Sequence, residues 1–130
     1  MKQRWLSVPV LSLYLAALTV SAQQQQTDPV GWWRVTAETS RGENTTTIRL
    51  DYFGGELSGS FTNSFIDAQL PIFDASLEGN NVAFKVQLIN ALMQYEGEIN
   101  GDELELSSRV IEGEIPGVPE ITTMTLTRSD

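Results

Sequence analysis

The chain has 130 residues, with seventeen acidic residues against eight basic ones, and it contains neither cysteine nor histidine. Disulfide frameworks, Ser-His-Asp and Cys-His catalytic sites, and ordinary zinc or haem sites are therefore excluded. The formal net charge of −9 repels phosphate backbones and anionic lipids, so we expect no nucleic-acid partner.

The first residues are typical of a secretory signal peptide. Two basic residues precede an apolar stretch over 5–20, and Ser21 and Ala22 are small, as a signal peptidase site requires. We expect 1–22 to be removed and 23–30 to form a flexible N-terminal segment, which leaves a net charge of 6 − 17 = −11.

An uncleaved membrane anchor is the alternative to this signal peptide. The apolar stretch is shorter than the ~20 residues that span a bilayer, and no second stretch follows it. We therefore expect an exported protein of the bacterial periplasm or the extracellular space, without a membrane span after signal removal.

Residues 31–130 have the pattern of one all-β domain. In segment 45–53, Thr46, Ile48 and Leu50 share one face, while polar residues occupy the other. No segment keeps a helical period. An antiparallel up-and-down meander of such strands hides its edges by closing into a small barrel. The pattern predicts about eight strands, over 31–39, 45–53, 56–63, 72–78, 82–88, 94–99, 103–109 and 121–128.

The expected connections fall into two groups when the strands run alternately up and down. Gly54-Gly55, Gly79-Asn80-Asn81 and Asn100-Gly101 lie at one end, the tight-turn end, and supply residues that tolerate the positive φ of hairpin turns. The longer connections lie at the opposite end, the long-loop end, and cover 40–44, 64–71, 89–93 and 110–120.

The connections at the long-loop end carry many apolar side chains, although polar residues would satisfy the same turns. Two interpretations stay open. These residues form a rim that binds an apolar small molecule or a partner's apolar segment, or they fold inward as a plug that completes the core. The candidate ligand-binding residues are Phe65, Ile66, Leu70, Ile72, Phe73, Ile89, Leu92, Met93, Val110, Ile111, Ile115 and Val118.

The first expected strand opens with Gly31-Trp32-Trp33, and Arg128 lies at the end of the last one. Gly31-Trp32-Trp33 is similar to the G-x-W signature that begins the first strand of lipocalins and their calycin relatives. In that family the tryptophan closes one end of the barrel, and an arginine near the end of the last strand packs across it. The resemblance implies these roles for Gly31, Trp33 and Arg128, and the alternation directs Trp33 and Arg128 inward at the tight-turn end.

The hairpin over 94–109 is strongly acidic. With Asn100-Gly101 as a two-residue turn, Glu98 faces Glu103 and Glu96 faces Glu105 on one outer face. A solvated face that keeps the protein soluble is one interpretation. A weak calcium site or a site for a basic partner is the other, with Glu96, Glu98, Glu103 and Glu105 as the metal candidates.

Two further patterns involve glycines, one in this hairpin and one shared with the expected strand 56–63. Tyr95-x-Gly97 followed by Gly101-Asp102 resembles small exported bacterial β-domains, a resemblance that implies no activity. Gly59 and Gly97 point inward, where they relieve strain in a strongly coiled barrel or leave space for a ligand.

The sequence predicts no catalytic residue and no cofactor, and the only enzymatic chemistry left is a carboxylate pair of the glycosidase type. We expect an exported, non-enzymatic binding protein that holds an apolar small molecule or a partner's apolar segment at the long-loop end. The alternative is a protein-interaction or structural module with a filled barrel and no small ligand. The oligomeric state stays open.

Overall fold

The computed structural model describes residues 28–116 and 121–129, and the predicted signal peptide lies outside these residues. Within them the chain forms nine β-strands and no helix, hence no helix long and apolar enough to cross a membrane. The strands are β1 (Gly31–Thr39), β2 (Gly42–Phe53), β3 (Glu56–Asn63), β4 (Ile66–Pro71), β5 (Phe73–Glu78), β6 (Asn81–Gln87), β7 (Ala91–Asn100), β8 (Glu103–Gly113) and β9 (Ile121–Ser129).

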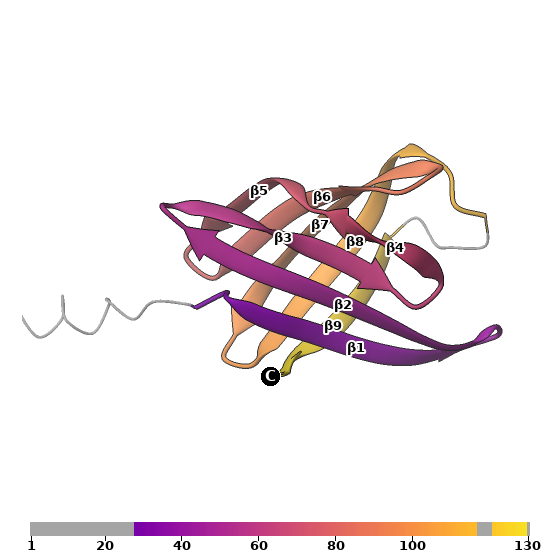
Figure 1. Ribbon diagram of the computed structural model, residues 1–130, viewed down its shortest axis with the longest axis horizontal. Helices are drawn as coiled ribbons and strands as arrows, with labels where there is room; N and C mark the ends of the chain where they lie inside the picture. The colour runs from indigo at the N-terminus through magenta and orange to yellow at the C-terminus, as the bar shows by residue number, and fades with distance from the viewer. Residues whose placement is uncertain (1–27, 117–120, 130) are drawn as a thin grey trace, which may run out of the picture.

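The strands form one antiparallel sheet in the order β4-β3-β2-β1-β9-β8-β7-β6-β5. Each strand follows its neighbour in the chain, except that β1 lies beside β9. The sheet curls until its two edge strands, β4 and β5, meet as consecutive parts of the chain (Figure 1). The predicted fold, an all-β up-and-down meander that closes into a small barrel, is confirmed in a nearly closed form.

The ninth strand comes from β4, which the sequence analysis placed inside a connection. β4 pairs with β3, whereas β5 pairs with β6 on the opposite edge of the sheet. Between them, the Ile72 N–H donates to the Gly59 carbonyl oxygen at 3.1 Å, and Phe73 pairs with Lys85. Segment 66–78 is therefore one bent strand that crosses from β3 to β6, and only its second half was predicted.

The four connections at the long-loop end are shorter than predicted. The β1–β2 and β3–β4 turns take only residues 40–41 and 64–65, because the flanking strands extend toward them. β8 likewise continues to Gly113. A strand that continues past its last clear alternation gains backbone hydrogen bonds from its partner, which a single segment of sequence does not reveal.

The inward faces of the strands fill the barrel with large apolar side chains. Tyr95 stacks on Phe84, with ring centroids 5.1 Å apart, and lies tilted against Phe61 at 5.6 Å. The buried apolar core comprises Trp33, Ile48, Leu50, Leu57, Phe61, Ile72, Val82, Phe84, Val86, Ala91, Met93, Tyr95, Ile99, Leu104, Leu106 and Leu126.

Gly59 and Gly97 mark places where neighbouring strands approach each other closely. A Cβ added at Gly59 would meet the Arg49 carbonyl oxygen, and one at Gly97 would meet the Glu105 carbonyl oxygen. Both contacts are with backbone, so the glycines permit the strong coiling of a small barrel. Of the two interpretations offered for these glycines, this geometry favours the relief of strain.

Candidate functional site

The tight-turn end is closed by a tryptophan and an arginine. Trp33 on β1 is fully buried, and its indole N–H donates to the Pro29 carbonyl oxygen at 3.0 Å. The guanidinium of Arg128 lies over the Trp33 ring, 4.3 Å from its centroid. The outward neighbour Trp32 is 42% exposed. The two tryptophans thus have the opposite orientations that the alternation predicts.

Arg128 also holds the segment that leads into β1. Its guanidinium donates to the Val30 carbonyl oxygen at 2.7 Å and to the Asp28 carbonyl oxygen at 2.9 Å. It further donates to the Gly101 carbonyl oxygen at 3.2 Å and forms an ion pair with Asp102 at 3.0 Å. One side chain therefore joins the start of β1, the end of β9 and the β7–β8 turn, which leaves this end firmly closed.

The long-loop end differs, because β1 and β9 pair there only in part. Their ladder has three residue pairs, Trp32 with Ser129, Trp33 with Arg128 and Arg34 with Thr127. Beyond it β1 continues beside β2 and β9 continues beside β8, in different directions (Figure 1). We call the unpaired stretches, 35–39 of β1 and 121–126 of β9, the β1–β9 seam.

The candidate ligand-binding residues divide into three groups in the structure. Ile72 and Met93 belong to the buried core. Five others are partly buried, and four of these pack against the core: Ile66, Leu70, Val110 and Ile115, with Leu92 on the outer phase of β7. The exposed ones are Phe65, Phe73, Ile89 and Ile111. Val118 lies outside the described residues.

Some of these positions fit a binding rim at the long-loop end, and others fit a filled barrel. Ile72 and Met93 point inward from the strands of the wall and complete the core, as the filled-barrel interpretation requires. Ile89 is 95% exposed in the β6–β7 turn and Ile111 is exposed near the end of β8, so both keep the accessibility that a rim needs. Of the predicted site residues, only the exposed ones remain candidates for contact with a ligand.

β9 also contributes apolar side chains to this end, which was not predicted. Ile121 is 64% exposed at the start of the strand, and Met124 is partly buried against the core. Both border the β1–β9 seam. Their signal was present in the sequence, since segment 121–127 has no charged residue, glycine or proline, but a regular strand gave no reason to assign it to a site.

A row of polar side chains crosses the inner face of the barrel near the seam. Tyr95 pairs with Ser108, and Ser108 pairs with Thr122. Burial raises the pKa of Tyr95 to about 12. Ser108 donates to the Thr122 carbonyl oxygen at 3.5 Å, whereas the buried Thr122 Oγ1 has no hydrogen-bond partner among the described residues. The interior is therefore less apolar here than beside Trp33.

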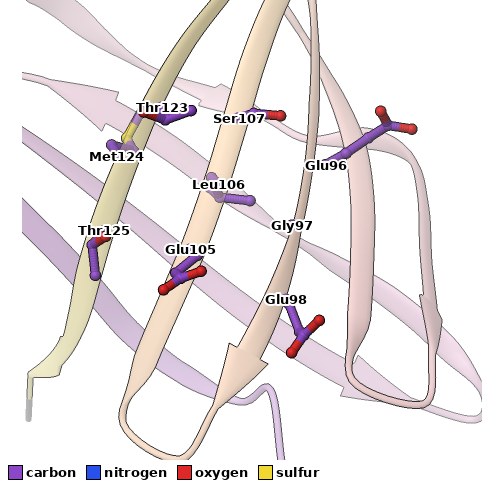
Figure 2. Close-up of a pocket in the computed structure, with 9 residues that line it drawn as sticks. All are labelled: Glu96, Gly97, Glu98, Glu105, Leu106, Ser107, Thr123, Met124 and Thr125. Carbon is purple, nitrogen blue, oxygen red and sulfur yellow. The ribbon is translucent and has the colours of Figure 1, made fainter.

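A shallow open groove of about 480 Å³ crosses the outer face of β7, β8 and β9. Figure 2 shows carboxylates from β7 and β8 on this face, with the threonines of β9 beside them. Its lining comprises Glu96, Gly97, Glu98, Glu105, Leu106, Ser107, Thr123, Met124 and Thr125.

The predicted register of the acidic hairpin is wrong by two residues, because the turn lies one residue further along the chain than predicted. Gly101 and Asp102 form the turn, with Gly101 at a φ of 64° that glycine readily adopts, so Asn100 faces Glu103. Glu98 therefore faces Glu105, and Glu96 faces Ser107. In the described part of the chain, no three acidic side chains are placed to hold a metal ion.

Comparisons of the chain with protein-family models, curated proteins and solved structures find no match.

Proposed function

We propose that this chain is an exported, non-enzymatic binding protein of lipocalin-like architecture, which holds an apolar segment of a partner at its long-loop end. Export is inferred from the basic, apolar and small residues of positions 1–22, which are typical of a signal peptide. The lipocalin-like assignment is inferred from Gly31, Trp33 and Arg128.

The observation that carries the proposal is the β1–β9 seam. A small barrel gains most by closing its sheet, because closure satisfies the edge strands. This barrel closes beside Trp33 and stays unpaired from Val35 onward, where Ile121 is exposed and Met124 is only partly covered. Apolar side chains beside unpaired backbone have the surface properties of a binding site.

The filled interior favours a segment at the opening over a molecule enclosed in the barrel. Trp33, Phe84 and Tyr95 occupy the space that a lipocalin-type cavity needs, and Phe84 and Tyr95 stack directly. A ligand of this barrel therefore contacts the long-loop end from outside.

The alternative function is a structural module that needs no ligand. The burial of Ile72 and Met93 favours it, since these two candidate residues already serve the core. The two functions differ in what the exposed residues do, because a structural module makes no use of Ile121 or Ile111.

Binding of the neutral dye Nile red, whose fluorescence rises in apolar surroundings, tests the proposal. The wild-type protein should raise the fluorescence of the dye, and Ile121→Ser should reduce this increase because Ile121 borders the seam. Phe53→Ser is the matched control, because Phe53 is 89% exposed at the opposite end of the barrel. Neither substitution should lower the melting temperature markedly, since both side chains are exposed.

Equal dye binding by the wild type and both variants would contradict the proposal. An absence of dye binding to the wild type would do so as well, and would leave the structural module as the remaining function.

A further inference from the structure

The free edge of β9 presents backbone donors and acceptors toward the seam. The Arg128 N–H donates to the Asp102 carbonyl oxygen on the β8 side at 2.8 Å. Backbone groups of successive residues in a strand point to opposite sides, and the β8–β9 register has no irregularity. The N–H and C=O groups of Ile121, Thr123 and Thr125 therefore point toward β1, where the described residues provide no ladder partner.

This edge lacks the devices by which proteins prevent strands from pairing with other chains. Edge strands usually carry charged residues, proline or bulges. β4 has Asp67 and Pro71, and β5 has Asp74 and Glu78. The β9 stretch Ile121–Thr127 has none of these features, and its threonines favour extended structure. The free edge of β1, at 35–39, carries Glu38, so among these described edges β9 alone has neither a charged residue nor proline.

The two faces of the seam differ in chemistry. On the inner side lie the apolar, partly buried side chains of Val35 and Met124. On the outer side, Thr123 and Thr125 border the groove that contains three glutamates (Figure 2). An extended segment beside β9 would therefore direct alternate side chains toward an apolar surface and toward an acidic one.

We propose that the free edge of β9, at Ile121, Thr123 and Thr125, accepts an extended segment of a partner protein as an added strand. Apolar side chains of the segment face the barrel interior, and a basic side chain faces the acidic groove. This inference rests on the proposed function, because it specifies the partner that the long-loop end binds and the way it binds.

The charges around the edge locate the basic residue of the segment. Glu105 faces Thr125 across the ladder, and Glu98 faces Glu105 on the next strand. Arg109 faces Ile121, at the other end of the edge. Arg34 turns away from β9, since its Nε donates to the Thr47 hydroxyl at 3.3 Å. The basic side chain is therefore expected beside Thr125 rather than beside Ile121.

Charge also argues against a second copy of this chain as the occupant. Two copies paired through β9 would bring two acidic grooves together, each with three glutamates, on chains of net charge −9. Repulsion of this kind disfavours self-association and favours a basic partner.

Fluorescence anisotropy with labelled peptides of alternating valine and lysine tests the inference on the full mature protein. The valine-lysine peptide should bind, and the matched valine-glutamate peptide should not. A valine-lysine peptide with N-methyl groups on the amides that face β9 should bind at least about tenfold more weakly, because at least one backbone hydrogen bond is lost.

Four protein variants test where the peptide binds. Thr123→Pro removes an N–H that points to the free edge and leaves the β8 ladder intact, so it should abolish peptide binding. Thr123→Lys tests the same edge by repelling the lysines, if the proline variant does not fold. Glu105→Gln should weaken binding and reduce its dependence on salt. Phe53→Ser should bind the peptide like the wild type.

Equal binding of the N-methylated peptide would overturn strand addition. Loss of all peptide binding, with Nile red binding at the seam retained, would overturn this inference alone, whereas loss of both would also remove the proposed function. A concentration-dependent dimer that Thr123→Pro converts to a monomer in analytical ultracentrifugation would identify a second copy as the occupant and overturn the partner assignment.

Discussion

The two ends of this barrel use the same pair of strands in opposite ways. At the tight-turn end β1 and β9 pair, Trp33 of β1 is fully buried, and Arg128 joins three parts of the chain. At the long-loop end the same two strands do not pair with each other over 35–39 and 121–126, and Ile121 is exposed. The difference shows that a barrel this small is closed locally by specific side chains, and that closure at one end does not impose closure at the other.

The largest expected effect comes from opening the closed end. Trp33→Ala should lower the free energy of unfolding by about 3–5 kcal/mol, because it removes a large buried side chain and the surface on which Arg128 stacks. Trp32→Ala is the control, since Trp32 is partly exposed and contacts Arg49 at 5.2 Å from its ring centroid. Denaturant melts measure both. Equal costs would mean that the tight-turn end is not held by Trp33.

The pH dependence of the free energy of unfolding tests whether water is excluded from the Tyr95 side chain in the middle of the barrel. Burial raises the pKa of Tyr95 from 10.0 in the unfolded chain to about 12 in the folded one. The unfolded state therefore loses this proton first, and the stability contributed by the neutral phenol is fully present below pH 10 and is lost as the pH rises to about 12. The loss should amount to about 2–3 kcal/mol.

Urea melts between pH 9 and about pH 12 measure this loss. Tyr95→Phe should lack the component because it has no titrating phenol in the core. If the wild type and Tyr95→Phe lose stability in parallel, Tyr95 is hydrated and the open end extends deeper than the structure indicates.

The smallest expected effect concerns the outer face of the acidic hairpin. Glu98 lies directly opposite Glu105, and like charges in this position are unfavourable. Glu98→Gln should therefore raise the free energy of unfolding by about 0.2–1 kcal/mol. Thermal melts in low salt measure the change, and calcium chloride should act like sodium chloride at matched ionic strength. A stabilisation specific to calcium that Glu98→Gln removes would instead restore the calcium site as a working hypothesis.

The sequence predicted well those features that depend on short-range alternation. Alternation along the strands predicted that Trp32 points outward and Trp33 inward, and that Ile48 and Leu50 share the inner face. The glycine pair at 54–55 predicted the turn between β2 and β3. The strands 31–39 and 56–63 were predicted with the bounds that the structure gives them.

The prediction was less successful where one strand serves two partners. Ile66 and Leu70 of β4 pack against the core, as does Ile72 after it, but Asp67 and Pro71 are residue types typical of connections. An edge strand accommodates both, because it has one side without a ladder. The candidate residues Ile66 and Leu70 were therefore assigned to a connection, although they pack against the core of the barrel.

By itself, then, the sequence determined the fold class and the face of each recognised strand, because these are written in local alternation. The contact of Trp33 with Arg128 at the tight-turn end was implied by a family resemblance, and alternation supported it. Only the tertiary structure decided the register of Glu98 against Glu105, the crossing at Ile72 and the β1–β9 seam. Each of these depends on how strands pair across the sheet. Alternation fixes which way a side chain points but leaves open which residue lies opposite and where pairing stops.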